Sequence, residues 1–130
     1  MAAKKPEIRM GKVQLRIMQF LWERGEATAR EISDYVIATE PISHSTVQTL
    51  LRKLEQKNAV RHVDKDRVFY FSPVANREDV TNSTTREFLN RVFQGSATSL
   101  VSHILEHEKI SPDELRQLHE MIEEYREKTK

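Results

Sequence analysis

The sequence predicts a mainly α-helical fold that contains one small β-hairpin. Apolar residues recur at helical spacing along most of the 130-residue chain, whereas β-forming residues are concentrated in residues 60–71. Charge divides the chain near Asn76: residues 1–75 contain 13 lysines and arginines against 9 acidic residues, and residues 76–130 contain 8 against 11. We therefore expect two domains, 1–75 and 76–130, of which the basic one faces an anionic partner.

Composition excludes several classes of function. The chain has no cysteine, so it has no disulfide, no thiolate metal site and no cysteine nucleophile. No apolar run approaches the roughly 18 residues that span a bilayer, and Met1-Ala-Ala-Lys-Lys-Pro lacks the apolar core of a signal peptide. No phosphate-binding loop or nucleophile elbow is present. We expect a cytoplasmic protein that is not an enzyme and has no cofactor and no membrane partner.

Two helices are predicted in the first forty residues. The first has an apolar stripe and is ended by Gly25. The second opens with Thr28-Ala-Arg-Glu31, a capping box in which the two side chains satisfy each other's backbone amides. Pro41 closes the segment after it. The residues expected to be buried are Val13, Ile17, Phe20, Leu21 and Trp22 in the first helix, and Ile32, Tyr35 and Val36 in the second.

A third helix is predicted over residues 43–57, capped by Ser43 or Ser45. Val47, Leu50, Leu51 and Leu54 form its inward stripe. The other face carries small polar and basic side chains, namely Ser43, His44, Ser45, Thr46, Gln48, Thr49, Arg52 and Lys53. Such side chains fit a DNA major groove, where they hydrogen-bond base edges or phosphates. Taken alone, such a face more often belongs to an ordinary solvated helix.

The hairpin that follows favours the first interpretation. Its strands are rich in β-formers, its turn lies at residues 64–67, and Arg61, Lys65 and Arg67 are placed to hold phosphates or enter a minor groove. Three short helices followed by a basic hairpin at residues 60–71 are the elements of a winged helix-turn-helix domain. We therefore predict that fold for residues 1–75. The alternative is a winged helix that contacts a protein instead of DNA.

The second half is predicted to contain three helices. Gly95 ends the first, and Ser111-Pro-Asp-Glu114 opens the third with an N-cap, a first-position proline and a capping glutamate. Three helices of this size bury too little surface to be stable alone, so we expect a second copy to cover them. The alternative is a monomer in which this half folds back onto the winged helix. The predicted dimerisation residues are Phe88, Val92, Leu100, Ile104, Leu115, Leu118, Ile122 and Tyr125.

The chain resembles the penicillinase-repressor family of winged-helix transcriptional regulators (BlaI, MecI and CopY type). The matching residues are Leu15, Ile17-Met18, Leu21-Trp22, Thr46-Val-Gln-Thr-Leu-Leu-Arg-Lys-Leu54, Arg67, Ser72-Pro73 and Phe93-Gln-Gly-Ser96. The resemblance implies a homodimeric repressor with a C-terminal helical dimerisation domain that binds a palindromic operator. It also implies that Ser45, Thr46 and Thr49 enter the major groove. Asn58 and Asp66 stand where relatives commonly have glycine, and both residue types tolerate a left-handed backbone.

The inducing signal, the target genes and the operator sequence are not determined by the sequence. His103 and His107 could hold a metal between two imidazoles, but further ligands are missing nearby, so a metal-responsive regulator is only an alternative. The resemblance also implies a sensor protease that cuts an Asn-Phe bond in this half. The matching position reads His103-Ile104, which argues against cleavage there. The cysteine pair of the copper-responsive branch is absent.

Overall fold

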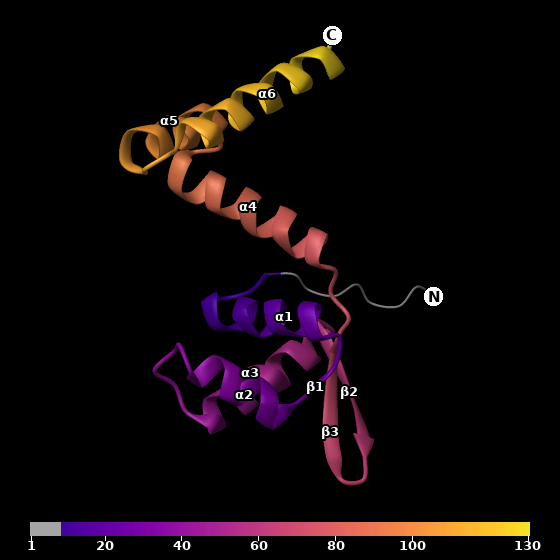
Figure 1. Ribbon diagram of the computed structural model, residues 1–130. Coiled ribbons are helices and arrows are strands. Elements are labelled where there is room, and N and C mark those ends of the chain that lie inside the picture. The colour runs from indigo at the N-terminus through magenta and orange to yellow at the C-terminus, as the bar shows by residue number, and fades with distance from the viewer. Residues whose placement is uncertain (1–8) are drawn as a thin grey trace. The chain divides into compact units, whose positions relative to one another are not determined.

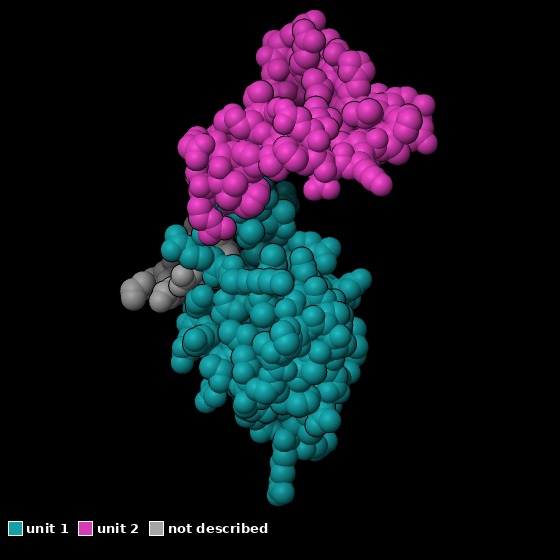
Figure 2. Space-filling model, turned by 90° about the vertical axis from the view of Figure 1, so that its left-hand side faces the viewer, with its two compact units in different colours: residues 1–87 teal, residues 88–130 magenta. Residues whose placement is uncertain are grey.

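The computed structural model describes residues 9–130. The segment 1–6, which we expect not to be part of a signal peptide, lies outside the described residues. Within them the chain forms two compact units that meet between Glu87 and Phe88 (Figure 2). The elements, labelled in Figure 1, are α1 Lys12–Arg24, β1 Ala27–Thr28, α2 Ala29–Ile37, α3 His44–Gln56, β2 Val60–Lys65, β3 Val68–Pro73, α4 Arg77–Phe93, α5 Ala97–His107 and α6 Pro112–Lys128.

The core of the first unit lies between α1, α2, α3 and the sheet. Each helix turns one apolar stripe inward, as the spacing predicted. The fully buried side chains are Ile17, Met18, Leu21, Ile32, Val36, Val47, Leu51, Leu54, Val60 and Val80. The expectation that Tyr35 is buried is wrong: its side chain stays 38% exposed and stacks on Phe20, with 4.5 Å between ring centroids. Stacking at the edge of the core leaves the phenol in contact with water.

The sheet has three antiparallel strands in the order β1-β3-β2. The predicted hairpin is confirmed, with His62 opposite Phe71 and Lys65 opposite Val68. The short strand β1, which pairs Ala27 with Phe71, was not predicted. Two residues are too few to show the alternation that marks a strand in a sequence.

Left-handed backbone occurs at the two predicted positions, because φ is 61° at Asn58 and 53° at Asp66. Arg67 also has a positive φ, 67°, and was not predicted to do so. Positive φ at both central residues is the geometry of the tight hairpin turns that match the twist of the strands. The turn at residues 66–67 therefore holds the hairpin closed without a glycine.

The start of α4 belongs to the first unit. The Asn76 side chain accepts from the backbone amides of Glu78 and Asp79, at 2.8 and 3.3 Å, and so caps the helix. One turn later, Val80 is fully buried in the core. The compact units therefore meet inside α4, rather than at the predicted boundary between residues 75 and 76.

The second unit comprises the end of α4 together with α5 and α6. Ser111 caps α6 as predicted, its hydroxyl accepting from the Glu114 amide at 3.1 Å. Aromatic contacts join α4 to α5, with 5.7 Å between the ring centroids of Phe93 and His103. No side chain in residues 88–130, all of which the structure describes, is buried. Among the described residues, no helix has both the length and the apolar character to cross a membrane.

Candidate nucleic-acid interface

The exposed face of α3 is the main candidate surface. Its opposite face is fixed in the core by Val47, Leu51 and Leu54, which determines which side chains point outward. The Thr49 hydroxyl donates to the Ser45 carbonyl at 3.0 Å and accepts from Arg52 Nη2 at 3.4 Å. All predicted contact residues of the helix are exposed: Ser43, His44, Ser45, Thr46, Gln48, Thr49, Arg52 and Lys53.

Two of these predicted contact residues hold the helix in place. The Ser43 hydroxyl is the N-cap and accepts from the Thr46 amide at 3.2 Å. His44 Nδ1 shares a hydrogen bond with the hydroxyl of Ser33, a buried residue of α2, and His44 Nε2 lies 4.0 Å from Asp34 Oδ1. His44 therefore ties the start of α3 to α2 and fixes the angle between the two helices.

The hairpin of β2 and β3, hereafter the wing, carries the remaining predicted contacts. Arg61, Lys65 and Arg67 are all exposed. Lys65 Nζ lies 3.4 Å from Glu26 Oε1 and 5.0 Å from the centroid of the Tyr70 ring, so this lysine already has an acidic and an aromatic neighbour. Arg67 stands at the tip, where its backbone amide donates to Asp64 Oδ1 at 2.9 Å. The wing thus presents basic side chains from its base to its tip.

A side-chain hydrogen bond connects the wing to α3. Glu55, near the end of α3, lies with its Oε2 2.6 Å from Nδ1 of His62 in β2. The imidazole also stacks on Phe69, with 4.2 Å between centroids. Helix and wing are therefore joined by side chains as well as by the chain between them.

The capping box predicted at the start of α2 is confirmed. Glu31 accepts from the Thr28 amide at 2.9 Å, and the Thr28 hydroxyl accepts from the Glu31 amide at 3.1 Å. The bond from the Thr28 amide, followed by the hydrogen bond from Arg24, lowers the pKa of the Glu31 carboxyl. This anion fixes the first turn of the helix on which His44 docks.

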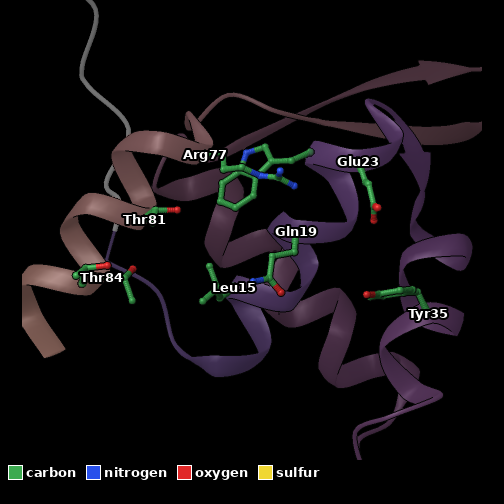
Figure 3. A pocket seen from close by; sticks show the side chains of 9 residues that line it. Leu15, Gln19, Glu23, Tyr35, Arg77, Thr81 and Thr84 are labelled. Atoms are coloured by element: carbon green, nitrogen blue, oxygen red, sulfur yellow. The ribbon is translucent and has the colours of Figure 1, made fainter. Parts of the chain in front are cut away.

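A groove of about 480 Å³ lies elsewhere on the first unit (Figure 3). Among the lining residues, the guanidinium of Arg77 lies 5.5 Å from the centroid of the Trp22 ring. The lining residues are Leu15, Gln19, Trp22, Glu23, Tyr35, Arg77, Thr81, Thr84 and Thr85, none of which belongs to α3 or to the wing. The groove is therefore separate from the candidate interface.

The histidine pair of the second unit lies on one face of α5. The rings of His103 and His107 stack with 4.1 Å between centroids, and His107 Nδ1 lies 3.0 Å from the His103 carbonyl oxygen. Within residues 9–130, no group of three or more acidic or histidine side chains is placed to hold a metal ion.

Sequence reasoning missed the residues that hold the interface in place. Ser33 and Asp34 contact His44, Glu26 contacts Lys65, and Glu55 contacts His62. None of these pairs follows a local spacing rule, so only the folded chain identifies them. Asp34 and Glu26 are the more important omissions, because each lies beside a residue that was predicted to contact DNA, His44 and Lys65 respectively.

A helix-turn-helix with an exposed polar second helix and a basic wing defines a winged-helix DNA-binding protein. The chain matches the family described as penicillinase repressor over residues 10–124. It belongs to the penicillinase repressor family, and it is a DNA-binding transcriptional repressor.

Individual relatives agree with this assignment. The penicillinase repressor of Bacillus licheniformis is 29% identical over 117 residues, covering 90% of this chain and 91% of that protein. The transcriptional regulator BlaI of Mycobacterium tuberculosis is 27% identical, covering 89% and 84%. The solution structure of the DNA-binding domain of the repressor BlaI is 26% identical, with a TM-score of 0.52 over 58% of this chain and 93% of that one. The structure of a MarR variant of E. coli in complex with operator DNA shares the fold. It is 10% identical, with a TM-score of 0.52, and the match covers 89% of this chain and 75% of that one.

Proposed function

We propose that the protein acts as a homodimer that reads an inverted-repeat operator, with α3 in the major groove and the wing on the flanking backbone. One observation carries this proposal. The helix buries Val47, Leu51 and Leu54, and it exposes an uninterrupted polar and basic face on the opposite side. A face without long apolar side chains allows the close approach to base edges that direct readout requires. A solved relative, the DNA-binding domain of BlaI, supports the same use.

The side chains divide by role. Ser45, Thr46 and Thr49 are proposed to touch bases near the start of the helix, because short hydroxyl side chains reach base edges and thymine methyl groups at close range. Gln48 is suited to adenine, and Arg52 and Lys53 to guanine or phosphate. Arg61, Lys65 and Arg67 are proposed to contact phosphates or the minor groove. Ser43 and His44 act by holding α3 in position.

Dimerisation is proposed from the second unit. Its apolar side chains remain exposed in a single chain, including 55% of Ile122, 69% of Tyr125 and 62% of Met121, which was not among the predicted residues. A group of exposed apolar side chains of this kind marks a surface that a partner covers. A second copy is the simplest partner, because a twofold pair presents two copies of α3 to two half-sites.

The test is selection of bound duplexes from a random pool by the full-length protein. We expect an inverted repeat whose half-sites are about one helical turn, or a multiple of it, apart. Thr49→Asp should weaken binding to the selected duplex at least about tenfold, because a carboxylate would meet the phosphates and bases. Thr81→Asp, at an exposed threonine of α4, is the matched control. Recovery of no common sequence, or equal binding of selected and random duplexes, would contradict the proposal.

We propose that this function includes no catalytic step and that the protein acts in the cytoplasm. A sensor protease remains a prediction from the family. The residues at the matching position, His103 and Ile104, both lie in α5. Incubation with a sensor protease from a relative of the family, followed by mass measurement of the fragments, would establish whether the bond between them is cut.

A further inference from the structure

Glu55 and His62 form a side-chain bridge between the two elements proposed to contact DNA. The atoms Glu55 Oε2 and His62 Nδ1 lie 2.6 Å apart, and the two side chains are only 34% and 30% exposed. A hydrogen bond in which one partner is a carboxylate is shorter and stronger than one between neutral groups.

The histidine is itself held against the wing. Its ring lies 4.2 Å from Phe69, stacked, and 5.4 Å from Phe71, tilted. Phe71 is only 6% exposed and belongs to the core. The imidazole is thus fixed by aromatic rings of β3 on one side and by a carboxylate of α3 on the other. Rotation of the wing relative to α3 would have to break one of these contacts.

We propose that this pair, the Glu55–His62 clamp, positions the wing relative to α3 so that both elements engage one operator half-site together. The inference rests on the proposed DNA contacts of α3 and the wing. Two linked contact surfaces bind more tightly when their spacing is already set, because the ordering cost is met during folding. The clamp residues are positioning residues, and neither needs to touch DNA.

Loss of the clamp and loss of a negative charge should change the affinity for DNA in opposite directions. Glu55→Ala deletes a negative charge beside a DNA-binding surface, which by electrostatics alone should tighten binding. If the clamp sets the wing, the same change should weaken binding to the selected duplex about three- to tenfold, which corresponds to the net contribution of one ordinary hydrogen bond. His62→Phe should weaken it similarly while keeping the aromatic stack. Glu55→Gln, which retains an acceptor oxygen, should restore most of the binding.

The decisive measurement places Glu55→Ala in a chain that also carries Arg61→Ala, Lys65→Ala and Arg67→Ala. With the wing contacts removed, loss of the clamp should have no further effect on affinity, because wing position no longer matters. Thermal unfolding of each variant identifies any general destabilisation. A persistent tenfold loss in this background, or tighter binding by Glu55→Ala alone, would overturn the proposal. If the unaltered protein selects no duplex, the proposed function fails instead.

Amide exchange in the DNA-free protein gives a readout independent of the operator. We expect Glu55→Ala and His62→Phe to raise exchange in residues 61–69 severalfold and to leave α1 and α2 unchanged. Unchanged exchange in the wing would show that the clamp does not restrain it.

Discussion

At the scale of single residues, acidic neighbours moderate the basic surface. Lys65 is 3.4 Å from Glu26, and both side chains are about half exposed. An exposed ion pair of this kind contributes little to stability and is easily exchanged for another anion. Its larger effect falls on binding, because a phosphate that takes Lys65 must also approach the Glu26 carboxylate.

We expect Glu26→Gln to raise affinity for the selected duplex about two- to fivefold at low salt, since Lys65 is released and a repelling charge is removed. Glu23→Gln removes the same charge from an exposed side chain of α1 and serves as the control. Binding isotherms at two salt concentrations provide the measurement. Equal gains from both variants would mean that only net charge matters.

Arg67 combines backbone strain with a proposed function. Its φ of 67° is unfavourable for residues other than glycine, asparagine and aspartate, and this backbone strain costs about 1 kcal/mol of stability. Arg67→Gly should therefore increase the free energy of unfolding in urea by about 1 kcal/mol and yet weaken DNA binding. Arg67→Lys keeps both strain and charge, and should leave stability unchanged. A glycine variant that is less stable than the parent would refute the strain argument.

At the scale of elements, α2 depends on its first turn. The capping box of Thr28 and Glu31 satisfies two backbone amides, and Arg24 holds the Glu31 carboxylate through a 2.8 Å ion pair. These contacts favour the charged form, which is why the pKa of Glu31 is lowered. Because α2 carries the partners of His44, the cap also supports the position of α3.

The lowered pKa of Glu31 gives stability a defined acid dependence. The contribution is fully present above the unfolded pKa, near 4.5, and is lost as the pH falls through the lower folded pKa. Glu31→Gln should accordingly flatten the fall in stability below that pH, as measured by urea unfolding across the range. Thr28→Ala should destabilise the protein by about 1 kcal/mol at neutral pH. Parallel pH profiles for parent and Glu31→Gln would exclude this role.

Most elements could be predicted because their signals are local. The capping box at Thr28, the cap at Ser111 and the turn residues Asn58 and Asp66 each act within a few positions of the chain. The strand β1 could not, because two residues show no period. The partners of His44 and Lys65 lie 11 and 39 positions away, so the sequence could indicate which side chains are basic or polar but not which are already engaged.

At the scale of the whole molecule, the two units differ in how they are stabilised. The first has a continuous buried core, whereas no side chain of residues 88–130 is buried. The proposed dimer would supply the buried surface that this unit lacks, so we expect its folding to vary with protein concentration.

We expect Ile122→Asp to dissociate the proposed dimer, because a carboxylate would have to be buried in an apolar seam. Sedimentation should then report a monomer, and affinity for the inverted repeat should fall at least about a hundredfold as the second half-site is lost. Glu120→Lys, which changes charge on the polar face of α6, should do neither. A monomeric parent protein would rule out the dimer directly.

The indole of Trp22 allows unfolding of the first unit to be measured by itself. Its Nε1 donates to the Ala75 carbonyl at 2.9 Å, where the sheet leads into α4, and it is the only tryptophan in the sequence. Fluorescence emission from this one ring therefore follows the first unit alone, whereas far-ultraviolet circular dichroism follows the helices of both units. If the second unit melts separately, the two optical signals will have different midpoints, and only the dichroism will shift with protein concentration. Comparison of tryptophan fluorescence with circular dichroism therefore distinguishes unfolding of the first unit from unfolding of the second, without an added label.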